Sequence, residues 1–209
     1  MQILTEKLEF PPVVQANTYG MVAVGGDLSP ERLLLAYKSG IFPWYSKGEP
    51  IAWYSPDPRM VLFPDKLKVS KSMRKILRKG DFKVTVNQAF AKVIANCKNT
   101  NREAQGEFGT WITDKMEAAY NKLYELGIAK SIEVWKGDDL VGGLYGLEIN
   151  AIFCGESMFS NVSNASKVAF IHLVESNTYK LVDCQVYNNH LASLGAKEIS
   201  RTAFLECLK

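Results

Sequence analysis

Two short stretches in the second half of the chain place polar side chains among apolar neighbours. The first, Phe153–Phe159, carries Glu156 between Cys154 and Met158. Because side chains alternate along a strand, we expect these three residues to share one face and the two terminal phenylalanines to share the other. A carboxylate buried there needs a partner for its charge, so Glu156 is a candidate for chemistry. An exposed edge strand with Glu156 facing water explains the pattern equally well.

The second stretch, Val182–Val186, has Asp183 and Gln185 on one strand face and apolar side chains on the other. A strand with one buried and one solvated face explains this alternation without any function. The position of the pair near the end of a predicted strand favours a site, because ligands of α/β sheets often bind there.

Several common catalytic and cofactor motifs are missing from the chain. It has no Gly-x-x-x-x-Gly-Lys-Ser/Thr loop and no Gly-x-Gly-x-x-Gly fingerprint, so sites for nucleoside triphosphates and dinucleotides are not indicated. It has no Gly-x-Ser-x-Gly turn, and His190 has no evident nucleophile partner, which disfavours a covalent acyl-enzyme. The four cysteines are scattered and only two histidines are present, so we expect reduced thiols, no metal and no cofactor.

A basic segment, residues 66–79, contains seven lysines and arginines and no acidic residue, although the net charge of the whole chain is only +3. Ser70 is a suitable N-cap for a helix over 71–79, with Gly80 at its end. Four basic residues cover the outer positions of this helix: Lys71, Arg74, Lys75 and Arg78. A solvated helix face usually mixes both signs of charge, so this composition favours contact with a polyanion over a solvated face.

Three tryptophans, Trp44, Trp53 and Trp111, lie in or beside stretches rich in turn residues. Such aromatic residues usually pack where domains meet. Near a basic segment they could instead stack on unpaired bases of a single-stranded RNA end.

The elements that position these residues follow from caps, periodicity and turn residues. A helix begins after Ser29 and ends at Gly40, and the proline-rich stretches around it indicate a small N-terminal α/β domain over residues 1–58. In the second domain, residues 59–209, we expect helices over 71–79, 89–97, 114–126 and 165–175, and strands over 81–86, 131–135, 139–147, 151–159 and 181–186. This order predicts an α+β (mixed α/β) fold around a largely antiparallel sheet.

The opening residues lack the features of a signal peptide, and no apolar run is long enough for a membrane span. We therefore expect a cytoplasmic protein that does not contact a membrane.

Ten stretches of the chain resemble the bacterial leucyl/phenylalanyl-tRNA–protein transferases. In chain order they are Ala23–Pro30, Gly40–Trp44, Trp53–Arg59, Gly109–Thr113, Ser131–Trp135, Leu140–Gly146, Gly155–Ser160, Asn164–Lys167, Asp183–Gln185 and His190–Ala196. Each stretch alone is a weak signal, but all ten in the right order are specific.

The resemblance implies a GNAT-like acyltransferase domain joined to the small N-terminal domain. It implies that aminoacyl-tRNA, carrying Leu or Phe, replaces acetyl-CoA as the donor. The acceptors would be proteins with an N-terminal Arg or Lys, which become targets of N-degron degradation after the transfer. Residues 168–179 are a few residues shorter than this family suggests, so the preference between Leu and Phe stays open.

The resemblance places the chemistry on Asp183 and Gln185. The Gln185 carbonyl would accept a hydrogen bond from the attacking amine, while Asp183 orients or polarises Gln185. Glu156 would pair with the positive charge of the acceptor.

The implied substrate contacts lie on other elements. Trp44 and Trp111 would stack on the terminal adenosine of the tRNA, and the basic helix would contact its phosphates. Four apolar residues would line the pocket for the donated side chain: Leu144, Phe153, Met158 and Leu173.

Two alternatives from other classes remain. One is an N-acyltransferase of the same fold that uses acyl-CoA, and the other is a tRNA-binding protein without enzymatic activity.

Overall fold

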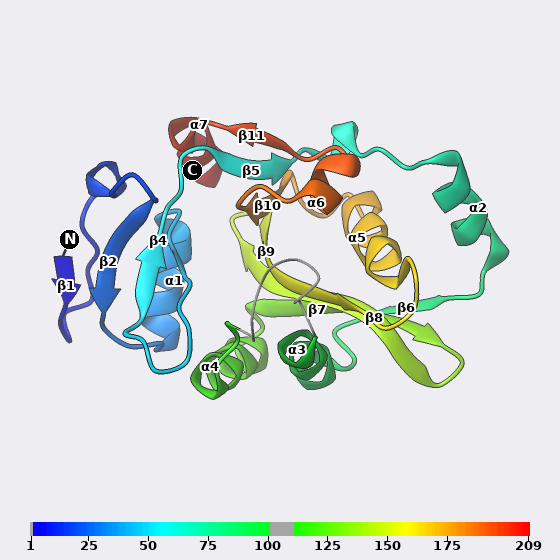
Figure 1. The fold of residues 1–209 in the computed structure, drawn as a ribbon, viewed down its shortest axis with the longest axis horizontal. Coiled ribbons are helices and arrows are strands. Elements are labelled where there is room, and N and C mark those ends of the chain that lie inside the picture. The colour runs from blue at the N-terminus through cyan, green and yellow to red at the C-terminus, as the bar shows by residue number, and fades with distance from the viewer. Residues whose placement is uncertain (1, 101–110) are drawn as a thin grey trace.

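The computed structural model describes residues 2–100 and 111–209, so the Gly109–Thr110 part of one family-like stretch lies outside the described residues. Within the described part, the strands form two sheets (Figure 1). A four-stranded sheet has the order β1-β2-β4-β3, and a seven-stranded sheet has the order β11-β5-β10-β9-β8-β7-β6. The mixture of helices with this mixed sheet confirms the predicted fold class.

The smaller sheet is built from the N-terminal quarter of the chain. Its elements are β1 (Gln2–Leu4), β2 (Met21–Gly25), β3 (Phe42–Pro43) and β4 (Ala52–Tyr54), with the 3-10 turn η1 (Val13–Gln15) and helix α1 (Pro30–Lys38) between strands. The Ser29 hydroxyl accepts a hydrogen bond from the backbone of Arg32, and Gly40 follows the helix with φ +74°. The start and end of this helix are therefore as predicted.

The larger sheet is mostly antiparallel. Its strands are β5 (Arg59–Leu62), β6 (Lys83–Val86), β7 (Ala129–Lys136), β8 (Asp139–Ile149), β9 (Ile152–Ser160), β10 (Leu181–Gln185) and β11 (Lys197–Ile199). Neighbouring strands from β6 to β9 are antiparallel, whereas β9 and β10 are parallel. Helix α5 (Ala165–Glu175) makes the crossover that a parallel pair requires.

Helices cover both faces of the larger sheet (Figure 1). Helices α3 (Phe90–Asn99) and α4 (Asp114–Glu125) lie on one face, and α5 lies on the other. Each face has its own apolar core, one shared with the N-terminal sheet and one beneath α5. None of the helices in the described parts has the length and apolar content needed to cross a bilayer.

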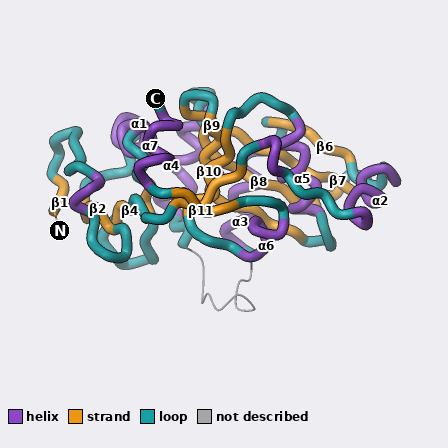
Figure 2. Tube along the Cα trace, turned by 90° about the horizontal axis from the view of Figure 1, so that it is seen from above, coloured by secondary structure: helices purple, strands orange, loops and turns teal. Residues whose placement is uncertain are grey.

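Helix α2 (Lys71–Lys79) lies at the end of the molecule opposite the N-terminal sheet (Figures 1 and 2). It follows the short 3-10 turn η2 (Pro64–Lys66). The Ser70 hydroxyl accepts a hydrogen bond from the backbone of Met73, and Gly80 ends the helix in the left-handed region. Met73 is the residue of this helix that is buried in the core.

The elements not predicted from the sequence are short. They are the strands of the N-terminal sheet, β5, β11, the turns η1 and η2, α6 (Asn189–Ser193) and α7 (Arg201–Leu208). Such elements carry too few residues for a periodic pattern, and β11 exists because it pairs with β5.

The two sheets separate between Tyr54 and Arg59, but the hydrophobic interior does not. Trp53 of the N-terminal part belongs to the same buried cluster as Phe90 and Tyr120 of the larger part. The core is thus continuous across the boundary between the two sheets, and the division into domains 1–58 and 59–209 stays a prediction.

Candidate active site

An extra residue in β9 sets the position of Glu156. Tyr145 of β8 pairs with Ser157. The next residue, Gly146, pairs with Gly155, which leaves Glu156 without an opposite residue, as in a β-bulge. Gly146 is needed at this point, because a Cβ there would lie 2.3 Å from a carbonyl oxygen of β9.

The bulge changes which residues of β9 share a face. Cys154 and Phe159 belong to the core on the side of α3 and α4, whereas Phe153 is buried beneath α5, where Met158 packs against the same cluster. The prediction that Cys154, Glu156 and Met158 share one face is wrong, because the inserted residue reverses the alternation. The edge-strand alternative is also wrong, because β9 lies between β8 and β10.

A second irregularity lies at the end of β10. Asp183 pairs with Val61 of β5, and Gln185 pairs with the adjacent Met60, so Cys184 is left over. Gln185 has φ +64°, and its backbone nitrogen donates to the Asp183 carboxylate at 3.0 Å. The ladder with β9 ends at Asp183, so the two parallel strands are no longer paired beyond this residue.

Asp183 is fully buried and paired with an arginine that the sequence did not single out. The Arg59 guanidinium donates to both carboxylate oxygens, at 2.8 and 2.7 Å, and its third nitrogen donates to the Gly40 carbonyl. The rings of Phe42 and Phe204 lie 4.8 and 4.5 Å from the guanidinium carbon. The interpretation of Asp183 as a residue on a solvated strand face is therefore wrong.

The Arg59–Asp183 pair has a clear electrostatic consequence. Burial acts to lower the pKa of Arg59, but the charge of Asp183 and its hydrogen bonds, with smaller contributions from Cys154 and Tyr37, together outweigh burial, so the pKa is raised. Both carboxylate oxygens of Asp183 are therefore bound by Arg59, and one of them also accepts from the backbone of Gln185.

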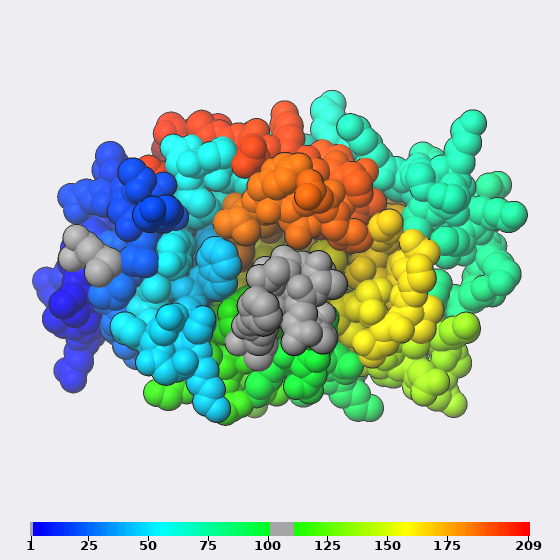
Figure 3. Space-filling model, viewed as in Figure 1, coloured from blue at the N-terminus to red at the C-terminus, as the bar shows by residue number. Residues whose placement is uncertain are grey.

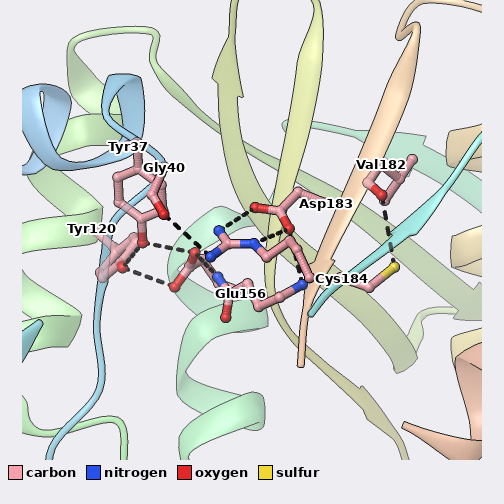
Figure 4. Close-up of polar contacts among 9 residues, drawn as sticks. Tyr37, Gly40, Tyr120, Glu156, Val182, Asp183 and Cys184 are labelled. Carbon is pink, nitrogen blue, oxygen red and sulfur yellow. Dashed lines mark hydrogen bonds and ion pairs between the residues drawn. The ribbon is translucent and has the colours of Figure 1, made fainter. Parts of the chain in front are cut away.

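Glu156 is the centre of a second polar group (Figure 4). Its Oε1 accepts hydrogen bonds from the Tyr37 hydroxyl at 2.7 Å and the Gln185 amide nitrogen at 2.8 Å, and its Oε2 accepts one from Tyr120 at 2.8 Å. The two tyrosine hydroxyls also contact each other. Burial, aided by the charge of Asp183, raises the pKa of Glu156 to about 7, although the three donors oppose the shift. Glu156 can therefore gain or lose a proton near neutral pH.

A cavity of about 530 Å³ opens where β9 and β10 separate. It reaches both faces of the sheet, because Glu156 and Phe42 line one part while Phe170 of α5 lines another. The nine residues predicted for catalysis, for stacking on the adenosine or for holding the donated side chain all line this cavity: Trp44, Trp111, Leu144, Phe153, Glu156, Met158, Leu173, Asp183 and Gln185. The fold thus brings them together, while their individual roles remain predictions.

Two further cavity residues have shifted pKa values. Burial lowers the pKa of His190, whose Nε2 is buried and has no hydrogen-bond partner among the described residues. Burial raises the pKa of the Cys184 thiol, which makes it a poor nucleophile. Within the described ranges, no three His, Cys, Asp or Glu side chains gather as a metal site would require.

The four basic residues of α2 do not line the cavity. Lys71, Arg74, Lys75 and Arg78 are exposed, and Figure 3 shows their helix at the edge of the molecule. Within the parts of the chain that the structure describes, none of the four forms an ion pair with an acid. The acids that flank the basic segment pair with its two ends, as Asp65–Lys66 and Lys79–Asp81.

Comparison with protein-family models decides the classification. Residues 61–209 match the model described as leucyl/phenylalanyl-tRNA protein transferase, and residues 26–57 match the model of the N-terminal domain of the same family. The chain belongs to the leucyl/phenylalanyl-tRNA protein transferase family. It is therefore a transferase, in agreement with the resemblance.

Relatives in this transferase family match the whole chain. A leucyl/phenylalanyl-tRNA–protein transferase of Flavobacterium johnsoniae is 59% identical over 212 residues, covering 100% of this chain and 99% of the relative. One of Flavobacterium psychrophilum is 57% identical and covers 100% of both chains.

Two solved structures show a remote similarity to this transferase. L-PGS from Bacillus licheniformis gives a TM-score of 0.42 at 11% identity, covering 80% of this chain and 54% of that one. A GCN5-related N-acetyltransferase from Kribbella flavida gives a TM-score of 0.38 at 10% identity, covering 82% of this chain and 61% of that one. At these scores the likeness adds nothing to the family assignment.

Sequence reasoning missed three residues that hold the site of this transferase together: Tyr37, Arg59 and Tyr120. Arg59 stands at the end of a family-like stretch, and that was its only signal. Tyr37 and Tyr120 lie on the apolar faces of α1 and α4, where a tyrosine is indistinguishable from a core residue until its hydroxyl partner is known.

Proposed function

We propose that this protein transfers leucine, and also phenylalanine, from aminoacyl-tRNA to the N-terminal Arg or Lys of acceptor proteins. The transfer forms a peptide bond and marks the acceptor for N-degron degradation. The observation that carries the proposal is the cavity at the end of β10, which combines an apolar wall with Glu156 and Gln185. The aminoacyl-tRNA donor and the thiols of Cys154, Cys184 and Cys207, which form no disulfide, fit a cytoplasmic location.

The apolar wall of the cavity suits the donated side chain. Leu144, Phe153, Met158 and Leu173 lie there, together with Phe170. An apolar pocket discriminates by only about 1–3 kcal/mol per methylene, so one pocket can accept both leucine and phenylalanine. Trp44 and Trp111 are the aromatic cavity residues available to stack on the terminal adenosine.

The amide of Gln185 has a defined orientation. Its nitrogen donates to Glu156, which leaves its carbonyl oxygen available to accept a hydrogen bond from the attacking amine. Asp183 orients this residue through the backbone, because it accepts the bond from the Gln185 backbone nitrogen. The aminoacyl ester is already activated, so positioning the amine would supply much of the rate gain.

Glu156 provides the carboxylate for the positive charge of the acceptor. An N-terminal Arg or Lys carries such a charge on its α-ammonium as well as on its side chain. The exposed basic helix α2 would hold tRNA phosphates without reading the bases.

The test is a transfer assay with radiolabelled Leu-tRNA and a protein that begins with Arg. We expect label in the acceptor protein, and a rate about 100-fold lower for Gln185→Ala because a group that contacts the reacting amine is lost. Gln15→Ala, which changes an exposed glutamine far from the cavity in sequence, is the matched control.

The alternatives predict other results in the same assay. A tRNA-binding protein without enzymatic activity would bind the tRNA and transfer no label. An acyl-CoA enzyme would transfer the acyl group of acyl-CoA, and CoA would bind saturably. Either result would contradict the proposal.

A further inference from the structure

The hydroxyl and carboxyl oxygens of Tyr37, Tyr120 and Glu156 form a closed ring of three contacts. Tyr37 contacts Oε1 of Glu156 at 2.7 Å, Tyr120 contacts Oε2 at 2.8 Å, and the two hydroxyls contact each other. Each contact needs one hydrogen, and each phenol supplies one. The third hydrogen can come only from a protonated Glu156.

Both protonation states of Glu156 therefore have partners. When Glu156 is neutral, its proton completes the ring with the two phenols. When it is ionised, both phenols and the Gln185 amide donate to the carboxylate. Burial, followed by the Glu156 charge, raises the pKa of both Tyr37 and Tyr120, so the phenols keep their protons in either state.

Glu156 is the acid of the cavity that can exchange a proton. Asp183 is held by Arg59 on both oxygens. Burial, followed by the Asp183 charge, raises the pKa of the Cys184 thiol, which keeps it protonated. His190 is another titratable residue of the cavity, and its imidazole Nε2 has no hydrogen-bond partner among the described residues. It is not surrounded by hydrogen-bond donors as Glu156 is.

We propose that Glu156, held between Tyr37 and Tyr120, takes the proton from the α-ammonium of the acceptor. This inference rests on the proposed function and names the group that activates its nucleophile. The amine must lose a proton because its pKa of roughly 8 leaves it mostly protonated near neutral pH.

The reaction balances in three steps. The α-ammonium gives one proton to the Glu156 carboxylate and becomes a neutral amine. The amine attacks the ester carbonyl carbon, so that a C–N bond forms, the C–O bond to the ribose breaks, and a second amine proton ends on the ribose oxygen. Glu156 then releases its proton to water.

Several titratable or charged groups surround Glu156. Tyr37 and Tyr120 face it from α1 and α4, Asp183 raises its pKa from β10, and Cys154 interacts with it electrostatically along β9. Arg59 of β5 stands behind Asp183 and is paired with it. The pKa of Glu156, about 7, lies in the working range of pH.

The first test is the pH dependence of kcat/KM for an Arg-starting peptide with Leu-tRNA. Since Glu156 must be ionised to take the proton, we expect kcat/KM to rise with a midpoint near 7. Glu156→Gln should lower kcat/KM about 100-fold at pH 7 and give a single rise near roughly 8. A single rise near 8 in the unmodified protein, or loss of the rise near 7 in His190→Asn, would overturn the inference and leave the proposed function standing.

The second test needs neither tRNA nor activity. Infrared difference spectra of the free protein should show a protonated carboxyl band that disappears as pH rises through about 7, and this band should be absent in Glu156→Gln. Its absence in the unmodified protein would overturn the inference. If the band titrates but no leucine is transferred, the proposed function fails instead.

Substitution of the two tyrosines tests the role of their hydroxyl groups. Tyr37→Phe combined with Tyr120→Phe removes two donors to the carboxylate while burial remains, so the band and the rise in rate should move to higher pH. If the double variant does not fold, the same measurements are made on Tyr37→Phe and on Tyr120→Phe alone. Tyr124→Phe is the matched control, because this α4 tyrosine donates to the Asn87 carbonyl. An unchanged midpoint in the double variant would contradict the role of the phenols.

Discussion

At the scale of single residues, the arginine that neutralises Asp183 matters as much as the residues that face the cavity. Arg59 and Asp183 are both fully buried, and each satisfies the charge of the other. Removing one partner of such a pair leaves a buried charge without compensation, which costs more than the pair itself contributes. The position of Gln185 depends on this pair, because Asp183 also accepts from the Gln185 backbone.

We therefore expect Arg59→Met to lower the free energy of unfolding by about 3–5 kcal/mol. Adding Asp183→Leu to this variant should recover much of the loss, because the unpaired charge is gone. Urea unfolding at pH 7 measures both effects, and Arg201→Met, in which the lost partner is the Ser55 carbonyl, is the control. A double variant no more stable than Arg59→Met would contradict this account.

At the scale of elements, two strand irregularities shape the candidate site, and one helix carries the proposed tRNA contact. The bulges in β9 and β10 turn Glu156 and Gln185 toward each other, although their strands are paired only as far as Asp183. The regular alternation of side chains along a strand does not predict this arrangement, because the position of a bulge depends on the pairing with the neighbouring strand. Helix α2, by contrast, follows from its own residues, since its caps and its basic surface are all local.

Charge reversal on α2 tests the tRNA contact. Arg74→Glu with Arg78→Glu should raise KM for the aminoacyl-tRNA and leave KM for the acceptor peptide unchanged. If each arginine meets one phosphate, the slope of log affinity against log salt should fall by roughly 2, about 0.9 for each contact. Lys115→Glu with Lys122→Glu, the same charge change on exposed positions of α4, is the control. Equal effects of the two double variants on KM for the aminoacyl-tRNA would show that α2 makes no specific tRNA contact and is an ordinary solvated helix.

At the scale of the whole molecule, the N-terminal part and the larger sheet share one core. Trp53 is fully buried, and its indole nitrogen donates to the Gly25 carbonyl. Tyr37 reaches from α1 to Glu156 on β9. The candidate active site thus spans the boundary between the two predicted domains.

We expect the chain to unfold as one cooperative unit for this reason. Trp53→Ala should lower the free energy of unfolding by about 3–5 kcal/mol, the usual cost of such a cavity. With Trp44 and Trp111 replaced by Phe in this variant, Trp135 in β7 is the remaining tryptophan, and its fluorescence and the far-UV circular dichroism should follow the same urea transition. Two separate transitions, with β7 unaffected by the substitution, would show that the larger sheet folds independently.

The sequence by itself determined the local features of this protein and, through resemblance, its family. Helix caps such as Ser29 and Ser70, the basic surface of α2 and the fold class depend on neighbouring residues, so they can be read along the chain. The family-like stretches also indicated Glu156, Asp183 and Gln185 before their surroundings were known.

Only the tertiary structure decided what surrounds these residues. Arg59 lies 124 positions from Asp183, and Tyr37 lies 119 positions from Glu156, so no local pattern connects them. Burial and the neighbouring Asp183 charge, which raise the pKa of Glu156, exist only once β9, β10 and the helices have packed together. The pKa of a carboxyl group depends on its surroundings in space, and the chain brings those surroundings together from distant segments.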